Sequence, residues 1–252
     1  MKERESRILV VVLTLVFSTR VAYVVLLRML CVIILQSIIH RSKMRTITSM
    51  ISQRLLSSLT TLPVGMQGWR PIIGITVTTT VAAGTGSIAT EFIHPREDFS
   101  PPLTLSGWCR PLSAFLVPGL LEEIIWRAAL LPTPVAPSSL STILHHATGS
   151  LAIANPATLV LYQTALTVLV VHVVSHPFFS AAVYPRGKEV FSDPRFLGLA
   201  TIVLGGTTIS YIVSGGSVWA AALTHGLPVA LWRDVFSGEQ ALQRGRVTVK
   251  KG

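Results

Sequence analysis

The stretch "VPGLLEEIIWRAALLP", residues 117–132, places three charged side chains in a run that is otherwise almost entirely apolar. They are Glu122, Glu123 and Arg127. A charged residue at the centre of a membrane helix costs about 2.5–3.5 kcal/mol. Charges in such a run are therefore expected to pair with one another or to take part in function.

The composition around this stretch is typical of a membrane protein. Of the 252 residues, 50% are hydrophobic and 13% are charged, and the mean hydropathy is +0.61. A soluble domain usually has about 25% charged residues. Several apolar runs approach the ~20 residues needed to cross a bilayer. We expect spans at 71–92, 111–131, 157–183, 196–214 and 217–236.

These runs predict helices, because backbone groups in lipid must bond within their own segment and the runs are too long and too apolar for barrel strands. The predicted fold is all-α. We expect a polytopic transmembrane helix bundle with about five core helices and one or two further apolar segments at the N-terminus. Charges and prolines predict loops at 91–102, 132–141 and 184–195.

The positive charge is unevenly distributed along the chain. The net charge is +10, yet no Asp or Glu occurs between Glu5 and Glu91. Basic flanks on apolar segments are typical of membrane topology and targeting. We therefore expect the lipid bilayer as a partner and exclude nucleic acid. The two cysteines, Cys31 and Cys109, lack the spacing of a disulfide framework or a cysteine zinc site.

The N-terminal region differs from the rest. Residues 8–39 form an apolar block broken by Arg20 and Arg28, longer than the about 7–15 residues of a signal-peptide core. Residues 40–63 are rich in Arg, Ser and Thr and lack acids, as organelle transit peptides do. A multi-pass protein of a plastid membrane is therefore one expectation. The endoplasmic reticulum and a bacterial-type inner membrane are the alternatives.

These differences in composition suggest three parts. We assign residues 1–62 to an apolar and basic targeting or anchor region, 63–240 to the helical core, and 241–252 to a basic tail.

The two adjacent acids are expected to have different environments. Residues four apart share one face of a helix, so Glu123 and Arg127 are predicted to pair as carboxylate and guanidinium. Glu122 is turned about 100° away around the helix and lacks that cation. An intramembrane carboxylate without a partner is a candidate for function.

Three histidines lie in other apolar runs. His172 and His176 are four residues apart in "LVVHVVSHPFFS", and His225 stands alone in "VWAAALTHGLPVALW". Imidazole beside a buried carboxylate suits the activation of water. A histidine in a membrane span can instead form a helix–helix hydrogen bond. Both readings stay open for His172 and His225.

The order of these motifs resembles the CAAX prenyl endopeptidase and bacteriocin-immunity family, whose peptidase members are glutamic-type intramembrane proteases. "EEIIWR" (122–127) resembles the family's Glu-Glu-x-x-x-Arg element. "HVVSH" (172–176) resembles Phe-x-x-x-His, with His172 in the Phe position. "HGLPV" (225–229) resembles His-x-x-x-Asn/Asp, with Val229 in the last position. The flanks over roughly residues 111–238 are similar to a short branch found in photosynthetic bacteria and plastid-bearing organisms.

The resemblance implies a hydrolase, an endopeptidase of the kind that processes CAAX-box proteins, acting on a peptide or membrane-protein substrate. Glu122 would be the general base, His176 would hold the attacking water, and His225 would stabilise the oxyanion. Glu123 and Arg127 would brace the motif helix.

His172 is expected to support these groups without contacting the substrate. The family is thought to work without a metal, so no cofactor is expected. The alternative is zinc held by Glu122, His176 and His225 as a His₂Glu set.

Two other functions compete with the endopeptidase. Val229 lacks the amide that would donate to the transition state, so the chain is also compatible with weak activity, or with an inactive membrane scaffold or chaperone-like factor of the same family. Intramembrane Glu and His residues can also relay protons in a transporter. Cleavage of a peptide and proton-coupled flux distinguish the enzyme from the transporter.

Overall fold

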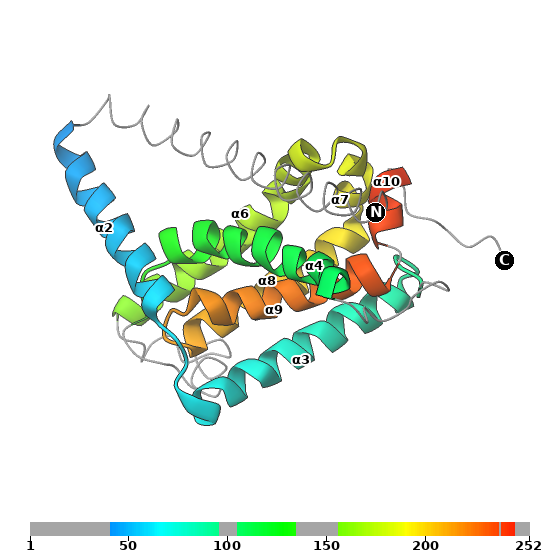
Figure 1. Ribbon diagram of the computed structural model, residues 1–252. Coiled ribbons are helices and arrows are strands. Elements are labelled where there is room, and N and C mark those ends of the chain that lie inside the picture. Colours follow the sequence, from blue (N-terminus) through cyan, green and yellow to red (C-terminus); the bar gives the residue numbers. More distant parts are fainter. Residues whose placement is uncertain (1–40, 96–104, 135–155, 237, 245–252) are drawn as a thin grey trace, which may run out of the picture. The chain divides into compact units, whose positions relative to one another are not determined.

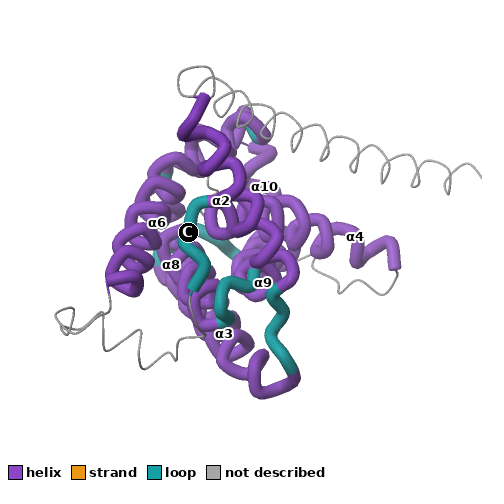
Figure 2. The backbone as a smooth tube through the Cα atoms, turned by 90° about the vertical axis from the view of Figure 1, so that its left-hand side faces the viewer, coloured by secondary structure: helices purple, strands orange, loops and turns teal. Residues whose placement is uncertain are grey.

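The computed structural model describes residues 41–95, 105–134, 156–236 and 238–244. Within these ranges every regular element is a helix, and extended backbone pairs at one isolated bridge between Pro95 and Phe236 (Figures 1 and 2). The all-α prediction is therefore confirmed for this part of the chain. The chain forms two compact units, Met1–Ser52 and Gln53–Gly252, and the site lies in the second.

The helices follow the sequence in one series of α, π and 3-10 segments. They are α2 (Arg41–Thr60), α3 (Gly65–Ala89), α4 (Leu105–Ala114), π-helical η1 (Phe115–Leu121) and η2 (Ile124–Ala129), α6 (Pro156–Val183), 3-10 helix η4 (Pro185–Gly187), α7 (Lys188–Ser192), α8 (Pro194–Val213), α9 (Val218–Ala230), π-helical η5 (Leu231–Val235) and α10 (Gly238–Arg244).

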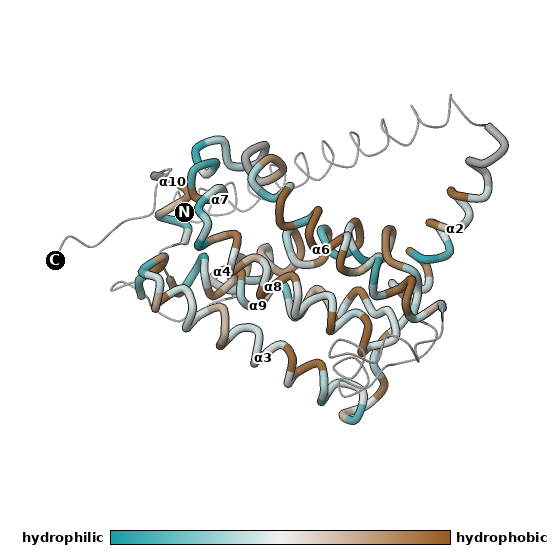
Figure 3. Tube along the Cα trace, turned by 180° about the vertical axis from the view of Figure 1, so that it is seen from behind, coloured by the Kyte–Doolittle hydropathy of each residue, from teal (hydrophilic) through white to brown (hydrophobic). Residues whose placement is uncertain are grey.

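Three described helices are long and apolar enough to cross a membrane: Gly65–Ala89, Pro156–Phe179 and Pro194–Val213. Hydrophobic residues recur along α6 in Figure 3, and several of them, including Leu166, Val170 and Phe178, are exposed as lipid-facing residues would be. These helices correspond to the expected spans at 71–92, 157–183 and 196–214.

The other two expected spans, 111–131 and 217–236, are helical but divided. The first contains the end of α4, then η1 and η2, and the second contains α9 and η5. Pro118 lies inside η1, and Pro228 lies inside α9 shortly before η5. Because proline lacks an N–H and its ring presses on the carbonyl four residues earlier, it disturbs the α-helical ladder. A π-bulge accommodates such a disturbance.

Two expectations placed helix boundaries wrongly, each because of a proline. The span expected to begin at Pro71 begins at Gly65, with Pro71 inside the helix. The loop expected at 184–195 contains η4 and α7, and α8 begins at Pro194. Pro185 and Pro194 lie in the first turn of their helices, where a missing N–H leaves no bond unmade. These prolines therefore start helices and do not break them.

The glycines of η1 and α9 allow these two segments to cross closely. A Cβ at Gly119 would lie 3.2 Å from both the Ala222 carbonyl oxygen and Gly226 Cα, and one at Gly226 would lie 2.9 Å from Phe115 Cα. Small residues at such a crossing let two backbones approach in a membrane. The crossing brings the Glu122–Glu123 pair, which directly follows η1, against α9.

Helices α3, α8 and α9 pack against one another (Figure 1). Thr224 of α9 connects all three, because its Oγ1 lies 2.8 Å from Thr76 Oγ1 of α3 and 2.9 Å from Ser210 Oγ of α8. All three side chains are buried. Hydrogen bonds of this kind link membrane helices that share an equally apolar surrounding.

The end of α2 also bonds to the second unit. Ser58 Oγ lies 2.8 Å from Tyr211 OH, with both residues fully buried, and Trp219 Nε1 donates to Leu59 O at 2.9 Å. The division after Ser52 therefore falls ten residues before the boundary that we placed at 62. Residues 1–40 and the tail beyond 244 lie outside the described residues, so their assigned roles stay predictions.

Candidate active site

The predicted pair of Glu123 and Arg127 is confirmed, and neither side chain is exposed. Arg127 Nε lies 3.2 Å from Glu123 Oε2, an ion contact without hydrogen-bond geometry, and Arg127 NH1 donates to Oε1 at 3.3 Å. Arg127 NH2 also donates to Leu204 O at 2.9 Å and to Thr208 Oγ1 at 3.2 Å, both on α8. The pair thus fixes η2 against α8.

Glu123 has a second partner, which the sequence did not reveal. His225 Nδ1 lies 2.8 Å from Glu123 Oε1. Since a carboxylate accepts, Nδ1 carries the proton and donates it. The other ring nitrogen, Nε2, faces the neighbouring acid, 3.9 Å from Glu122 Oε2. A carboxylate that orients an imidazole in this way is the arrangement of catalytic Asp–His pairs.

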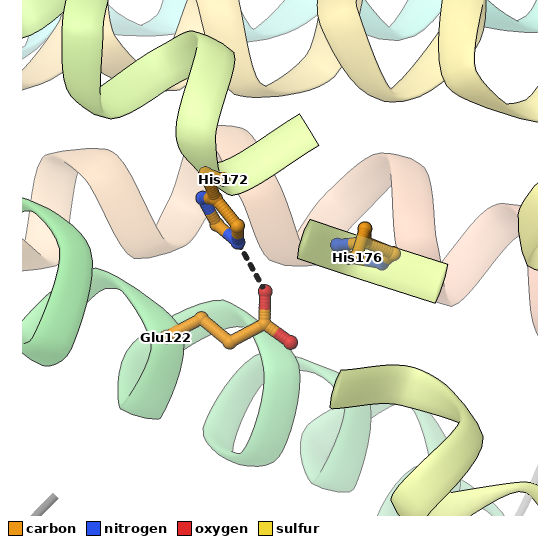
Figure 4. A group of neighbouring side chains, drawn as sticks. All are labelled: Glu122, His172 and His176. Carbon is orange, nitrogen blue, oxygen red and sulfur yellow. Dashed lines mark hydrogen bonds and ion pairs between the residues drawn. The ribbon is translucent and has the colours of Figure 1, made fainter. Parts of the chain in front are cut away.

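Glu122 lies at the other side of the same helix turn and is 29% exposed. Its Oε2 lies 3.2 Å from His172 Nε2 (Figure 4). Among the described lysines and arginines, none forms an ion pair with it. The expectation that Glu122 lacks the cation held by Glu123 agrees with this geometry.

His172 and His176 project from α6 toward Glu122 (Figure 4). One ligand atom from each of the three residues lies within 4.8 Å of the others. The His172 ring is 2% exposed and stacks on Trp126, with a centroid distance of 4.4 Å and an interplanar angle of 13°. The His176 ring lies 5.3 Å from the Phe196 ring and 5.8 Å from the Phe191 ring.

A pocket lies beside the two histidines that were predicted to be catalytic. His176 and His225 form part of its wall, and the rest of the wall is almost entirely apolar, with Phe92, Phe196 and Trp232 among its side chains. Its empty volume is about 690 Å³, including space open to solvent. The two acids and Arg127 do not line it. The five predicted site residues therefore come together, but the histidines stand between the pocket and the acids.

Distance alone would allow Glu122, His172 and His176 to hold a metal ion. The chemistry of His172 does not fit this role. Its Nδ1 lies 2.8 Å from Arg127 NH1, and a guanidinium can only donate. Nδ1 must therefore accept, and the neutral ring keeps its proton on Nε2, the nitrogen that would have to bind the metal. The expected zinc set of Glu122, His176 and His225 includes a different histidine and stays an alternative.

Comparisons of the chain with protein-family models, with curated proteins and with solved structures found no match. The resemblance of the three motifs to intramembrane endopeptidases therefore stays a prediction, carried by the motif residues and their order along the chain.

Proposed function

We propose that this chain is a glutamate-dependent intramembrane endopeptidase, a multi-pass protein of the kind suggested by the resemblance to the CAAX prenyl endopeptidase family. One observation carries the proposal. Of two adjacent acids in an apolar helix, Glu123 is held by Arg127 and His225, whereas Glu122 has no cation and faces three histidines. A carboxylate kept beside imidazoles in this way can take a proton from water.

In the proposed reaction, His176 holds a water molecule beside Glu122. Glu122 accepts one proton from this water, whose oxygen forms a bond to the carbonyl carbon of the substrate peptide. His225, charged and oriented by Glu123, stabilises the oxyanion. When the C–N bond breaks, the proton passes from Glu122 to the leaving amine. A preorganised oxyanion donor is worth about 3–4 kcal/mol.

The pocket supports a substrate with apolar side chains. Its wall is apolar apart from His176, His225, Thr80 and Ser87, so a peptide or a segment of a membrane protein could place apolar residues there and reach the histidines. Burial of one large apolar side chain contributes about 1.5–3 kcal/mol. The acid-free, Ser- and Thr-rich segment 40–63 favours a plastid membrane as the location.

An inactive scaffold of the same family is the second candidate, and one residue favours it. Val229 lines the pocket one turn after His225, at the position where the resemblance leads us to expect Asn or Asp. A valine cannot donate a hydrogen bond to the substrate. If the chain is a weak enzyme for this reason, Val229→Asn should raise the rate, and if it is a scaffold, this change should produce no cleavage.

The test is cleavage by the purified, reconstituted full chain. Prenylated peptides, the same peptides without prenyl groups, and transmembrane peptides are incubated with it, and products are identified by mass spectrometry. We expect products that disappear in Glu122→Gln and persist in Glu189→Gln, the same chemical change at an exposed residue of α7. Activity that persists in the presence of a zinc chelator supports the metal-free mechanism. The absence of products from every peptide would favour the scaffold.

A further inference from the structure

His172 stands where the resemblance leads us to expect phenylalanine, and the proposed reaction gives it no step. Both of its ring nitrogens nevertheless have partners. Nδ1 lies 2.8 Å from Arg127 NH1, and Nε2 lies 3.2 Å from Glu122 Oε2. The ring therefore connects the buried cation with the acid that has no cation of its own.

The direction of both hydrogen bonds follows from the chemistry of arginine. A guanidinium has five N–H donors and no acceptor, so Arg127 must donate and His172 Nδ1 must accept. A neutral imidazole with a lone pair on Nδ1 has its proton on Nε2. Nε2–H then donates to Glu122 Oε2. The contacts thus define one neutral tautomer of His172.

The ring has little freedom to leave this position. It stacks on Trp126 at 4.4 Å and is 2% exposed. Its donor, Arg127, is held by Glu123, by Leu204 O and by Thr208. Because the guanidinium has fixed partners on two other helical segments, it presents the same N–H to His172 throughout.

We propose that His172 is a positioning residue for Glu122, with its tautomer set by Arg127. Nε2–H holds one carboxylate oxygen of Glu122 and leaves the other for water. His172 neither gains nor loses a proton in the reaction. The catalytic consequence rests on the proposed endopeptidase function, whereas the tautomer rests on the contacts of the ring alone.

The tautomer is tested first, because this measurement needs no substrate. The full chain is labelled with ¹⁵N-histidine and studied by NMR in lipid nanodiscs at neutral pH, and His172→Gln identifies the His172 signals by their loss. We expect a neutral ring with the proton on Nε2. A ring with its proton on Nδ1, or a doubly protonated ring, would overturn the proposal whether or not the protein is an enzyme.

The positioning role is tested with two matched variants. His172→Phe keeps a ring against Trp126 and removes both nitrogens. His172→Gln offers an amide that can donate to Glu122 and accept from Arg127. We expect His172→Phe to lower kcat about 10–100-fold with little change in KM, and His172→Gln to recover most of the loss, while both variants stay folded by thermal unfolding.

Two outcomes contradict this role. A His172→Phe variant with full kcat would show that the hydrogen bond is not needed. An equal loss of kcat in both variants would show that the ring has a purely structural role. If the unaltered chain cleaves no peptide, the proposed function fails, and the NMR result still decides the tautomer.

Discussion

Glu122 and Glu123 are neighbours in the sequence and occupy opposite environments. Glu123 is fully buried, and its carboxylate lies 2.8–3.3 Å from three nitrogen atoms of Arg127 and His225. Glu122 is 29% exposed and accepts one hydrogen bond, from His172. A rotation of one residue around a helix thus separates an acid whose charge is used for structure from one whose charge is free for chemistry.

The difference has a simple energetic consequence. A buried carboxylate is tolerable when a cation and hydrogen bonds compensate for its lost hydration. Removing its charge leaves the cation uncompensated. An acid that lacks a cation gives the opposite result, because its neutralisation makes burial easier.

The largest effect is expected from Glu123→Gln. This change leaves Arg127 buried without its counter-charge, and breaking one side of such a pair costs about 3–5 kcal/mol. The variant should lose abundance in the membrane and unfold at a lower temperature than the unaltered chain. The matched control is Glu122→Gln, which should keep or gain stability. Equal loss of stability in the two variants would contradict the division between the acids.

The crossing of η1 and α9 is the next test, because it holds the two acids against His225. A Cβ on Gly226 would lie 2.9 Å from Phe115 Cα, so Gly226→Ala must push the backbones apart. We expect a loss of about 1–3 kcal/mol in unfolding free energy together with reduced activity. Gly205→Ala in α8 is the control, since a Cβ there meets nothing within 4 Å, and it should be neutral or stabilising.

A neutral buried pair provides a comparison with the charged one. Ser58→Ala removes the partner of Tyr211 OH, 2.8 Å away, and should cost about 1 kcal/mol, less than Glu123→Gln. The same bond predicts different effects for two truncations. A chain starting at Gln53 keeps Ser58, whereas one starting at Leu62 loses it and should be less stable in thermal unfolding. Equal stability of both truncated chains would place the boundary near 62, where the sequence suggested it.

The smallest effect is expected at a polar pair outside the buried cluster. Asp193 caps α8 and bonds to Arg195 at 2.7–3.0 Å, with side chains 17% and 32% exposed. Hydrogen bonds from Arg195 lower the pKa of Asp193 below its usual value of 3.8. Because the pKa is lower in the folded chain, the pair stabilises at neutral pH, and this contribution is lost as the pH falls through the folded-state pKa.

Asp193→Asn should therefore reduce stability by about 0.5 kcal/mol at pH 7, since asparagine still caps a helix. The difference between the variant and the unaltered chain should shrink below about pH 4. Unfolding measured at both pH values checks this. A constant difference would mean that the charge of Asp193 has no part in the effect.

The parts of the site that the sequence predicted are those set within one helix. Glu123 and Arg127 are four residues apart, so their pairing follows from helix geometry alone. The bonds from His225 to Glu123 and from Arg127 to His172 cross between helices, and no spacing in the sequence states which helices are neighbours. The glycines at the η1–α9 crossing were the available signal.

The sequence also misplaced what proline does. Proline was read as a boundary or loop residue near Pro71, Pro185 and Pro194, whereas it lies inside a helix or starts one. The π segments around the two acids depend on how packing absorbs Pro118, which no pattern of hydrophobic residues contains.

The central claim is that Glu122 is needed for chemistry and Glu123 for stability. It is tested most directly by measuring thermal unfolding and peptide cleavage on the same reconstituted preparation of Glu122→Gln. We predict an unfolding temperature at or above that of the unaltered chain, with cleavage reduced by a factor of about 10²–10⁴ or more. Full cleavage by Glu122→Gln, or instability as severe as that of Glu123→Gln, would contradict the claim.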